Sequence, residues 1–538
     1  MEQFSVFGNL VDLINSKIYP AKISIADKKI VSIEPQQEHY DTYILPGLID
    51  AHIHIDSSML PPSEFARMAS VHGTVATVSD PHEIANVLGK DGVRFMIENA
   101  KQTHFKFYFG APSCVPATDF ETSGAKLTAA DIEELFSEYD LKYLSEMMNF
   151  PGVIYDNPDV LAKIDIAKKF NKPIDGHAPG LRGEDARKYA QAGISTDHEC
   201  FDLEEAREKI RYGMNILIRE GSAAKNFETL APLLNESPDK CMLCSDDLHP
   251  DDLAKGHINL LVKRAIAMGT DPIKVLKIAT LNPIKHYGLD VGLLQVGDPA
   301  DFIVIDNFND FNILQTYIDG ELVADNGKSL LSFKNSSIIN NFQTNYKNPN
   351  DFKLSIKNTT IPVIKAIDGS LITERFDYKP VIIEDDVKCD LSNDILKIAV
   401  VNRYKDVKPA VWLINNFGLK RGAIATSVAH DSHNLIAVGV DNFSITEAIN
   451  ALIDTEGGMA VYDGTSANVL PLPIAGLMSN DDGWYAARKY EELNQSAKLL
   501  GTHLTSPFMT LSFMSLLVIP KLKLGDQGLF DVEKFAFV

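Results

Sequence analysis

Cysteine is scarce in this sequence. Five cysteines among 538 residues are an odd and low count, which fits a reducing compartment such as the cytoplasm. Cys241 and Cys244 form a C-x-x-C pair, but the sequence has no second pair to complete a structural zinc site. We therefore expect both thiols to lie in a buried strand.

Positive charge and long hydrophobic runs are also lacking. Lysine and arginine total 51 against 73 aspartates and glutamates, for a net charge of −22. Nucleic acids and anionic membranes both need clustered basic side chains, so neither is an expected partner. No segment approaches the roughly 18 apolar residues of a membrane span. Residues 1–20 lack the basic start and apolar core of a signal peptide, so we expect a cytoplasmic protein.

The pattern from residue 46 onward predicts a barrel. Apolar strand-like segments that end in polar residues alternate with helical patterns, which is typical of βα units and a parallel sheet. Eight such segments fall within residues 46–285, and this number and length predict a (β/α)₈ TIM-like barrel in an α/β protein. Pro61, Pro62 and Ser63 predict the start of the first helix, and Gly73 predicts its end.

The flanks of the barrel predict further units. Residues 1–45 and 286–334 carry short strand patterns with turn residues, so we expect one small composite β domain built from both flanks. Residues 335–351 are rich in asparagine and nearly uncharged, which indicates a linker. Residues 352–538 predict a C-terminal mixed α/β domain, in which Ser444 and Glu447 resemble a capping box at a helix start.

Two histidines end the first barrel segment, LIDAHIHID. Alternate residues of a strand point to the same face, so His52 and His54 are expected side by side. Other segments also end in ionisable residues, and active sites of such barrels lie at the carboxyl ends of the strands. The candidate metal ligands are His52, His54, Glu146, His177, His198 and Asp246.

These side chains are suited to two divalent cations. Imidazole and carboxylate are ligands for zinc, iron or manganese. We expect Glu146 to bridge two ions, which lie about 3.5–4 Å apart in such sites. Water held between two cations is a strong nucleophile at neutral pH, and Asp246 is the candidate to take its proton and pass it to a leaving group.

The order of these ligands along the barrel resembles the amidohydrolase superfamily. The segment ATLNPIKHYGLDVGLLQVGDPADFIVID resembles the stretch with which those enzymes leave the barrel and rebuild their β domain. More narrowly, the chain resembles the bacterial adenine deaminase family over nearly its whole length. The motifs that carry this resemblance are PGLIDAHIHIDSSML, DPHEIANVLG, SEMMNFPGVI, DGHAPGL, DHEC, SDDLHPDDL and VAHDSHN.

This resemblance implies a binuclear, manganese- or iron-dependent hydrolase that converts adenine and water to hypoxanthine and ammonia. Many amidohydrolases bridge their metals with a carboxylated lysine on the fourth strand. Here Lys142 comes too early in that strand and Glu146 occupies its end, which agrees with the narrower resemblance. We expect a homo-oligomer that acts on a small molecule.

Weaker candidates follow the first two strands. Glu83 and His82 are in a position to protonate a purine ring nitrogen or to support a metal ligand, and the alternative is a salt-bridged loop. Ser57 and Ser58 follow the paired histidines and are candidates for contact with the base.

Some alternatives stay open at this point. His430, Asp431 and His433 in VAHDSHN form either part of the pocket rim or an internal hydrogen-bond cluster of the C-terminal domain. The same metals would also serve an amidohydrolase that opens a cyclic amide or attacks a different aminopurine. A cytidine deaminase fold needs H-x-E followed by P-C-x-x-C, which the sequence lacks. A non-catalytic scaffold would have lost ligands, yet the full set is present.

Overall fold

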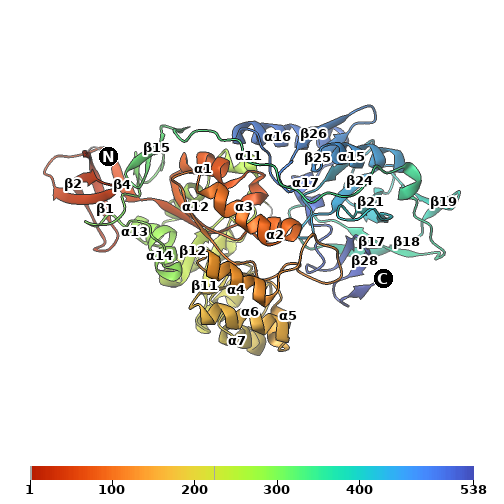
Figure 1. Ribbon diagram of the computed structural model, residues 1–538, viewed down its shortest axis with the longest axis horizontal. Coiled ribbons are helices and arrows are strands. Elements are labelled where there is room, and N and C mark those ends of the chain that lie inside the picture. Colours follow the sequence, from red (N-terminus) through yellow and green to blue (C-terminus); the bar gives the residue numbers. More distant parts are fainter. Residues whose placement is uncertain (1–2, 223) are drawn as a thin grey trace.

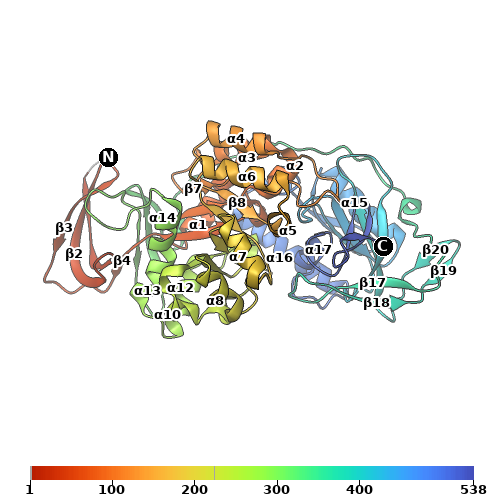
Figure 2. The same ribbon diagram turned by 90° about the horizontal axis from the view of Figure 1, so that it is seen from below.

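The computed structural model describes residues 3–222 and 224–538. In Figure 1 a twisted sheet near the N-terminus lies at one end, a ring of strands with helices around it lies in the middle, and a second large sheet lies at the other end. Figure 2 shows the same order after a 90° turn. Helices and strands both contribute along the chain, so the predicted mixed α/β class is confirmed.

The first sheet is built from both flanks of the ring. Its strands are β1 (Phe4–Asp12), β2 (Lys17–Ala26), β3 (Lys29–Pro35), β4 (Tyr43–Pro46), β13 (Phe302–Ile305), β14 (Ile313–Ile318), β15 (Glu321–Asp325) and β16 (Lys328–Ser329). They lie in the order β16-β15-β14-β13-β4-β1-β2-β3. β4 joins the two halves, because it pairs in parallel with β1 and antiparallel with β13.

The central ring consists of eight parallel strands within the described part of the chain. They are β5 (Leu48–Ile53), β6 (Thr74–Ser79), β7 (Lys106–Phe109), β8 (Leu144–Met147), β9 (Ile174–Gly176), β10 (Thr196–Asp197), β11 (Asn215–Arg219) and β12 (Cys241–Cys244). Ladders join β5-β6-β7, β8-β9 and β10-β11-β12. Single bridges from Ala111 to Leu144, from Ile174 to Ile194 and from Ile53 to Asp246 connect these groups and close the ring. Cys241 and Cys244 are buried in β12, as predicted.

Helices surround this ring, as Figures 1 and 2 show. They are α1 (Pro62–Ser70), α2 (His82–Leu88), α3 (Lys90–Ala100), α4 (Ala129–Glu138), α5 (Phe150–Ile154), α6 (Pro158–Lys169), α7 (Gly183–Gln191), α8 (Leu203–Arg211), α9 (Phe227–Leu230), α10 (Leu233–Glu236), α11 (Pro250–Leu253), α12 (Ile258–Ala267), α13 (Pro272–Leu276) and α14 (Asn282–Tyr287). The first helix begins among the predicted prolines and ends at Ser70, before the turn at Gly73. Asn157 and Asp202 cap α6 and α8 by accepting hydrogen bonds from first-turn amides.

The C-terminal region, residues 352–538, is organised around a second eight-stranded sheet. The strands are β17 (Ile361–Lys365), β18 (Glu374–Tyr378), β21 (Ile395–Val401), β22 (Ala410–Asn415), β23 (Ala423–Thr426), β24 (Leu435–Gly439), β25 (Gly458–Tyr462) and β26 (Ala467–Pro471). Smaller pairs and ribbons are β19 (Val381–Ile383) with β20 (Asp386–Lys388), and β27 (Leu522–Gly525) with β28 (Gly528–Asp531) and β29 (Ala536–Phe537). The helices are α15 (Asn442–Asp454), α16 (Gly483–Leu499) and α17 (Pro507–Ser512).

The two faces of this sheet pack against different neighbours. Along β21, Ile395 and Ala399 join the core beneath α15, whereas Leu396 and Ile398 join a core that continues into the ring. This alternation follows from the two-residue period of a strand. α15 begins at Asn442, because the Asp441 side chain accepts a hydrogen bond from the Ser444 amide. The predicted capping box at Ser444 is therefore wrong.

The asparagine-rich segment predicted as a linker lies against both the ring and the C-terminal region. It has no helix or strand before a short 3₁₀ helix, η4 (Pro349–Phe352). The Ser336 amide donates to Asn480 Oδ1, and the Ser336 hydroxyl accepts from Asn99 Nδ2 in α3.

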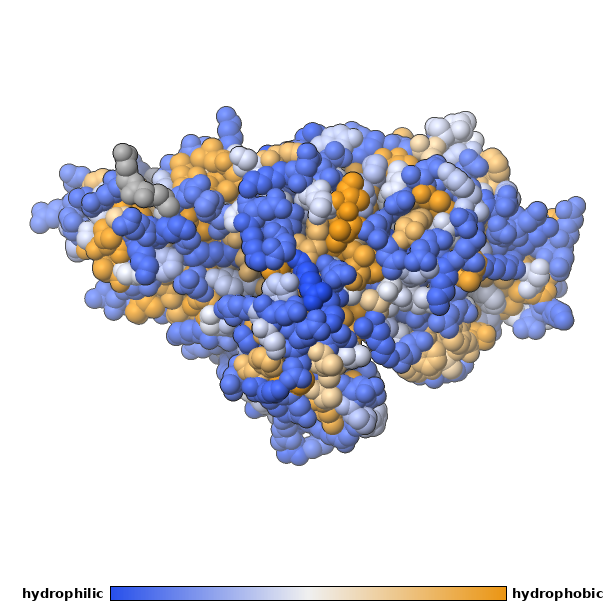
Figure 3. Space-filling model, viewed as in Figure 1, coloured by the Kyte–Doolittle hydropathy of each residue, from blue (hydrophilic) through white to orange (hydrophobic). Residues whose placement is uncertain are grey.

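The surface and the helix lengths agree with the lack of long apolar runs in the sequence. Hydrophilic residues cover most of the face shown in Figure 3, and hydrophobic residues lie between them in scattered groups. Every helix within the described residues is too short or too polar to serve as a membrane span.

Candidate metal centre

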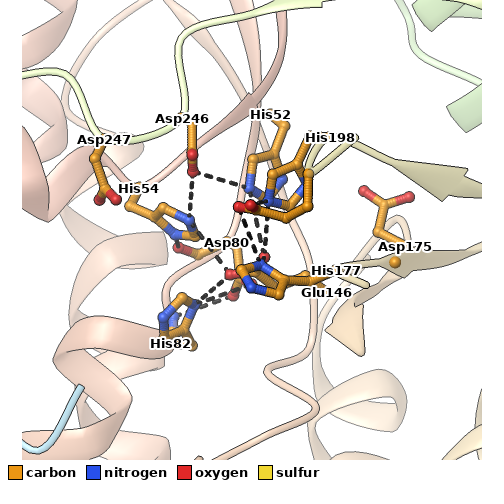
Figure 4. A network of polar contacts seen from close by, with 12 residues as sticks. His52, His54, Asp80, His82, Glu146, Asp175, His177, His198, Asp246 and Asp247 are labelled. Atoms are coloured by element: carbon orange, nitrogen blue, oxygen red, sulfur yellow. Dashed lines mark hydrogen bonds and ion pairs between the residues drawn. The ribbon is translucent and has the colours of Figure 1, made fainter. Parts of the chain in front are cut away.

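The six candidate ligands meet inside the ring, at the carboxyl ends of five strands. His52 and His54 lie at the end of β5, and Glu146 lies in β8. His177 and His198 follow directly after β9 and β10, and Asp246 follows β12 after one intervening residue. Figure 4 shows their side chains pointing toward one another from these separate strands. The parallel direction of the strands causes this convergence, because all carboxyl ends open on one side of the ring.

Asp246 faces the two histidines of the first strand. Its Oδ1 lies 3.1 Å from His54 Nε2 and 3.5 Å from His52 Nε2. Its other oxygen pairs with the Arg219 guanidinium at the end of β11. His52, His54 and Asp246 therefore form one group that offers three ligand atoms to an ion.

Glu146 stands between this group and the remaining two histidines. Its Oε2 lies 2.8 Å from His177 Nδ1 and 3.1 Å from His198 Nε2. Its Oε1 lies 3.4 Å from His54 Nε2. One carboxylate thus reaches both sides of the centre, as a bridging ligand must.

The electrostatics of the centre fit divalent cations. Burial alone would raise the pKa of Glu146, but His177 and His198 outweigh it and hold that pKa well below its usual range. Burial opposes ionisation of Asp246 as well, and Arg219 keeps its pKa low. Both groups are therefore carboxylates at neutral pH, which is the form that binds metals.

Several buried imidazole nitrogens point to the same conclusion. Among the described residues, His52 Nδ1 and Nε2 and His198 Nε2 have no hydrogen-bond partner. Burying a polar atom without a partner costs free energy. A cation bound by the two Nε2 atoms would remove that cost for them, so the residues present fit a metal centre.

A cavity opens beside the centre, between the ring and the C-terminal region. Glu146, His177 and Asp246 line it from the ring. The C-terminal region contributes a largely apolar wall, made of Leu371, Phe513, Leu516, Val518 and Ile519. Such a mixed lining offers both apolar and polar contacts to a small molecule.

Comparisons with known proteins agree with this geometry. The model of the amidohydrolase family matches residues 43–323, and the model of the adenine deaminase C-terminal domain matches residues 370–536. The adenine deaminase of Sulfurovum sp. (strain NBC37-1) is 57% identical over 532 residues, which are 99% of this chain and 98% of that protein. The chain belongs to the amidohydrolase family. The resemblance stated from the sequence is confirmed.

Two further relatives of this amidohydrolase are similar over the same length. The adenine deaminase of Methanosarcina mazei is 54% identical and that of Borreliella burgdorferi is 51% identical. The alignments cover 99% of this chain and 98% of the Methanosarcina protein, and 100% of both chains for the Borreliella protein.

Lys142, the lysine just before the fourth strand of the ring in this amidohydrolase, lies outside the centre. Its Nζ donates to Asp140 Oδ2 at 2.7 Å, before β8 begins. Glu146 is the side chain of that strand that points at the histidines.

Two charged residues of the centre were missed in the sequence. Arg219 ends the seventh strand segment, and Glu199 follows His198. Arg219 pairs with both Glu199 and Asp246, and Glu199 Oε1 lies 3.6 Å from His177 Nδ1 and from His198 Nε2. Their position at strand ends was the available signal, but nothing in the sequence indicated that they pair with each other.

A buried lysine holds the two strands that carry His177 and His198. Lys209 of α8 is fully buried and donates to the Ala178 carbonyl, to Asp197 Oδ2 at 3.0 Å and to Glu205 Oε1 at 2.7 Å. Ala178 follows His177 and Asp197 precedes His198. This lysine therefore fixes the backbone beside both candidate ligands.

Replacing Lys209 by methionine is expected to lower the free energy of unfolding by about 3–5 kcal/mol, because two buried carboxylates lose their cation. Urea unfolding followed by circular dichroism measures the change. Lys168→Met, at an exposed lysine of α6, is the control and is expected to change stability little. An unchanged urea midpoint for Lys209→Met would contradict the role given to this lysine.

The second strand supplies His82 and Glu83 at the start of α2. His82 Nδ1 lies 3.1 Å from Asp80 Oδ2 and 3.4 Å from Glu146 Oε1, so it adjoins the candidate bridging ligand. Glu83 contacts His430 and His433 of the C-terminal region.

The cluster of His430, Asp431 and His433 combines features of the two alternatives, a pocket rim and a hydrogen-bond cluster. His430 and Asp431 line the cavity, as a pocket rim would. The cluster is not internal to the C-terminal region, because its histidines bond to Glu83 of the ring.

Ser57 and Ser58 use their hydroxyl groups within the protein. Ser57 Oγ donates to Asp247 Oδ1 at 2.6 Å, and Ser58 Oγ donates to the Ile55 carbonyl at 2.5 Å. Asp247 lines the cavity, and within the described part of the chain neither serine does. Ser57 therefore contacts Asp247, a residue of the cavity lining, and does not itself line the cavity.

Proposed function

We propose that this protein hydrolyses adenine to hypoxanthine and ammonia. The observation that carries the proposal is the combination of six candidate ligands in one centre, five buried and His177 partly buried, with 57% identity to an adenine deaminase over almost the whole chain. The mixed apolar and polar cavity beside that centre supports a planar base as the substrate.

We further propose that the centre binds two manganese or iron ions. His52, His54 and Asp246 would hold one ion, His177 and His198 the other, and Glu146 would bridge them. Two bound divalent cations lower the pKa of water enough to supply a nucleophile at neutral pH. The rest of the reaction depends on groups of the chain that move protons.

Asp246 is the proposed proton carrier. Its Oδ1 lies inside the centre, and its other oxygen is held by Arg219, so the carboxylate is ionised and fixed in direction. It takes a proton from the attacking water and passes it to the amino nitrogen of C6. That nitrogen then leaves as ammonia.

Glu83 is the proposed donor to ring nitrogen N1, which makes C6 more electrophilic. Burial alone would lower the pKa of His430, but the adjacent Glu83 carboxylate outweighs it and raises the pKa to about 9. Burial alone would raise the pKa of Glu83, but His430 outweighs it and holds that pKa well below its usual range. The pair therefore carries one proton at neutral pH, on His430, and Glu83 would relay it to the ring. His82, between Asp80 and Glu146, keeps the candidate bridging ligand in place.

The finer organisation is also a proposal. We propose a TIM-like barrel over residues 46–285, a composite β domain over residues 1–45 and 286–334, and a C-terminal domain after a linker at 335–351. The pairing of β4 with β13 and the closed ring of β5 to β12 support these boundaries. A cytoplasmic homo-oligomer remains a prediction, and sedimentation equilibrium measures the oligomeric state.

The rival reaction, hydrolysis of a cyclic amide or of another aminopurine, uses the same centre. Enzymes that open a cyclic amide normally present a bridging lysine on the fourth strand, and the described centre has none, since Lys142 pairs with Asp140. The acidic protein, with a net charge of −22, also disfavours phosphorylated substrates through repulsion.

A substrate panel tests the proposed function. The manganese-loaded protein is incubated with adenine, adenosine, AMP, cytosine and dihydroorotate, and ammonia release and ultraviolet spectra are followed. We expect efficient turnover of adenine and poor turnover of adenosine and AMP, because a pocket closed around the base leaves no room for ribose. Turnover of dihydroorotate or adenosine with adenine untouched would refute the proposal.

A further inference from the structure

A loop of the C-terminal region reaches across to the ring and holds one of its side chains. This loop, residues 427–434, connects β23 to β24. Its His430 Nδ1 contacts Glu83 Oε1, and its His433 Nε2 contacts Glu83 Oε2 at 2.5 Å. Each carboxylate oxygen thus meets one imidazole, and all three residues are at most 3% exposed.

The hydrogen-bond pattern decides which nitrogen of His433 carries the proton. The Ala429 amide donates to His433 Nδ1 at 3.2 Å, so this nitrogen must be unprotonated. The neutral ring then carries its hydrogen on Nε2 and donates it to Glu83. Burial agrees with this form, because it lowers the pKa of His433 to about 4.

The His430 ring is held in a different way. Its face stacks on Phe513, with ring centroids 4.4 Å apart and planes inclined by 12°. Its backbone amide donates to the Ser512 carbonyl at 3.0 Å. α17 and the residue after it therefore fix the direction in which His430 Nδ1 meets Glu83.

The loop itself is anchored from both sides. Asn434 Nδ2 donates to the Thr122 carbonyl of the ring at 2.9 Å, and the His433 amide donates to the Ala429 carbonyl at 2.7 Å. Arg403 Nη1 donates to the His433 carbonyl. The two imidazoles are therefore presented to Glu83 on a fixed backbone.

We propose that His430 and His433 are positioning residues, which hold the Glu83 carboxyl group in the orientation needed to reach the substrate ring. The inference rests on the role proposed for Glu83 in protonating that ring. A carboxyl group bonded at both oxygens loses its rotational freedom about the last side-chain bond. Preorganisation of this kind acts on the reaction step, and a misplacement of about 1 Å costs on the order of 10²-fold in rate.

This role predicts a separation of kcat from KM. His433→Ala and His430→Ala are expected to lower kcat for adenine by about 10²-fold. KM for adenine and the metal content are expected to stay within a few-fold of the unchanged protein, since neither histidine is a candidate ligand. His433→Gln and His430→Asn place an amide N–H near the lost Nε2 and Nδ1 respectively, and they are expected to recover most of kcat.

A second substrate separates positioning from general damage. In 6-chloropurine the carbon is already electrophilic and chloride leaves without a proton, so ring protonation matters less. We expect the alanine variants to lose much less activity on 6-chloropurine than on adenine. His503→Gln, at an exposed histidine of the same region, is the control and is expected to behave as the unchanged protein on both substrates.

The outcomes distinguish failure of this inference from failure of the role proposed for Glu83, on which it rests. Parental kcat on adenine in both alanine variants would overturn the positioning role, as would equal losses on the two substrates. If an alanine variant fails to fold, the folded His433→Gln and His430→Asn variants take its place, and a loss of kcat in them that is as large on 6-chloropurine as on adenine would overturn the positioning role. Glu83→Gln tests the role of Glu83 separately. Full activity in Glu83→Gln would refute that role. Loss of activity in Glu83→Gln with parental activity in both histidine variants would refute the positioning role alone.

Discussion

Asp246→Asn is expected to lower kcat for adenine by about 10⁴-fold or more, at or beyond the upper end of what acid–base catalysis contributes. The amide keeps the shape of the side chain, but it cannot take a proton from water. It also weakens the contacts with His54 at 3.1 Å and with Arg219, so the group loses its place in the centre as well. Ammonia release measures kcat, and elemental analysis measures the metal content of the same preparation.

The same strand provides a matched control for this change. Asp239 is exposed and precedes β12, whereas Asp246 is buried and follows it. Asp239→Asn makes the same chemical change at the opposite end of the strand and is expected to leave kcat unaltered. Near-parental kcat in Asp246→Asn with its metals retained would show that Asp246 carries no proton.

Glu146→Gln is expected to remove the second metal ion and most of the activity. The carboxylate contacts His177 at 2.8 Å and His198 at 3.1 Å through one oxygen and His54 at 3.4 Å through the other. A neutral amide has one oxygen in place of two and no charge to share between two cations. Metal content after extensive dialysis, measured beside turnover of adenine, tests this expectation.

Glu98→Gln is the control for the change at Glu146. Glu98 is an exposed residue of α3 that pairs with Lys101 on the surface. We expect this variant to keep the metal content and the activity of the unchanged protein. Two tightly held ions and normal turnover in Glu146→Gln would mean that another group bridges the metals.

The candidate ligands could be identified from the sequence because local geometry decides where their side chains point. The two-residue period of a strand puts His52 and His54 on one face, and repeated βα units bring the carboxyl ends of their strands to one rim. His177, His198 and Asp246 could therefore be grouped although they are far apart along the chain. The first helix start was predictable for the same reason, since proline acts locally.

The start of α15 was mispredicted although its signals are local. Ser444 and Glu447 have the spacing of a capping box, but Asp441 caps the helix instead. Several polar residues within one turn compete for the cap position, and residue types alone do not decide which of them bonds to the free amides.

The sequence by itself determined which six candidate ligands converge on the centre of this protein. Only the tertiary structure decided which partners hold those side chains in place. Glu83 and His430 are 347 residues apart, and no period of a helix or strand relates positions at that distance. Arg219 became a partner of Asp246, and Lys209 of Asp197, because helices and strands pack in three dimensions. Ion pairs between separate elements depend on that packing, and local sequence patterns carry no record of it.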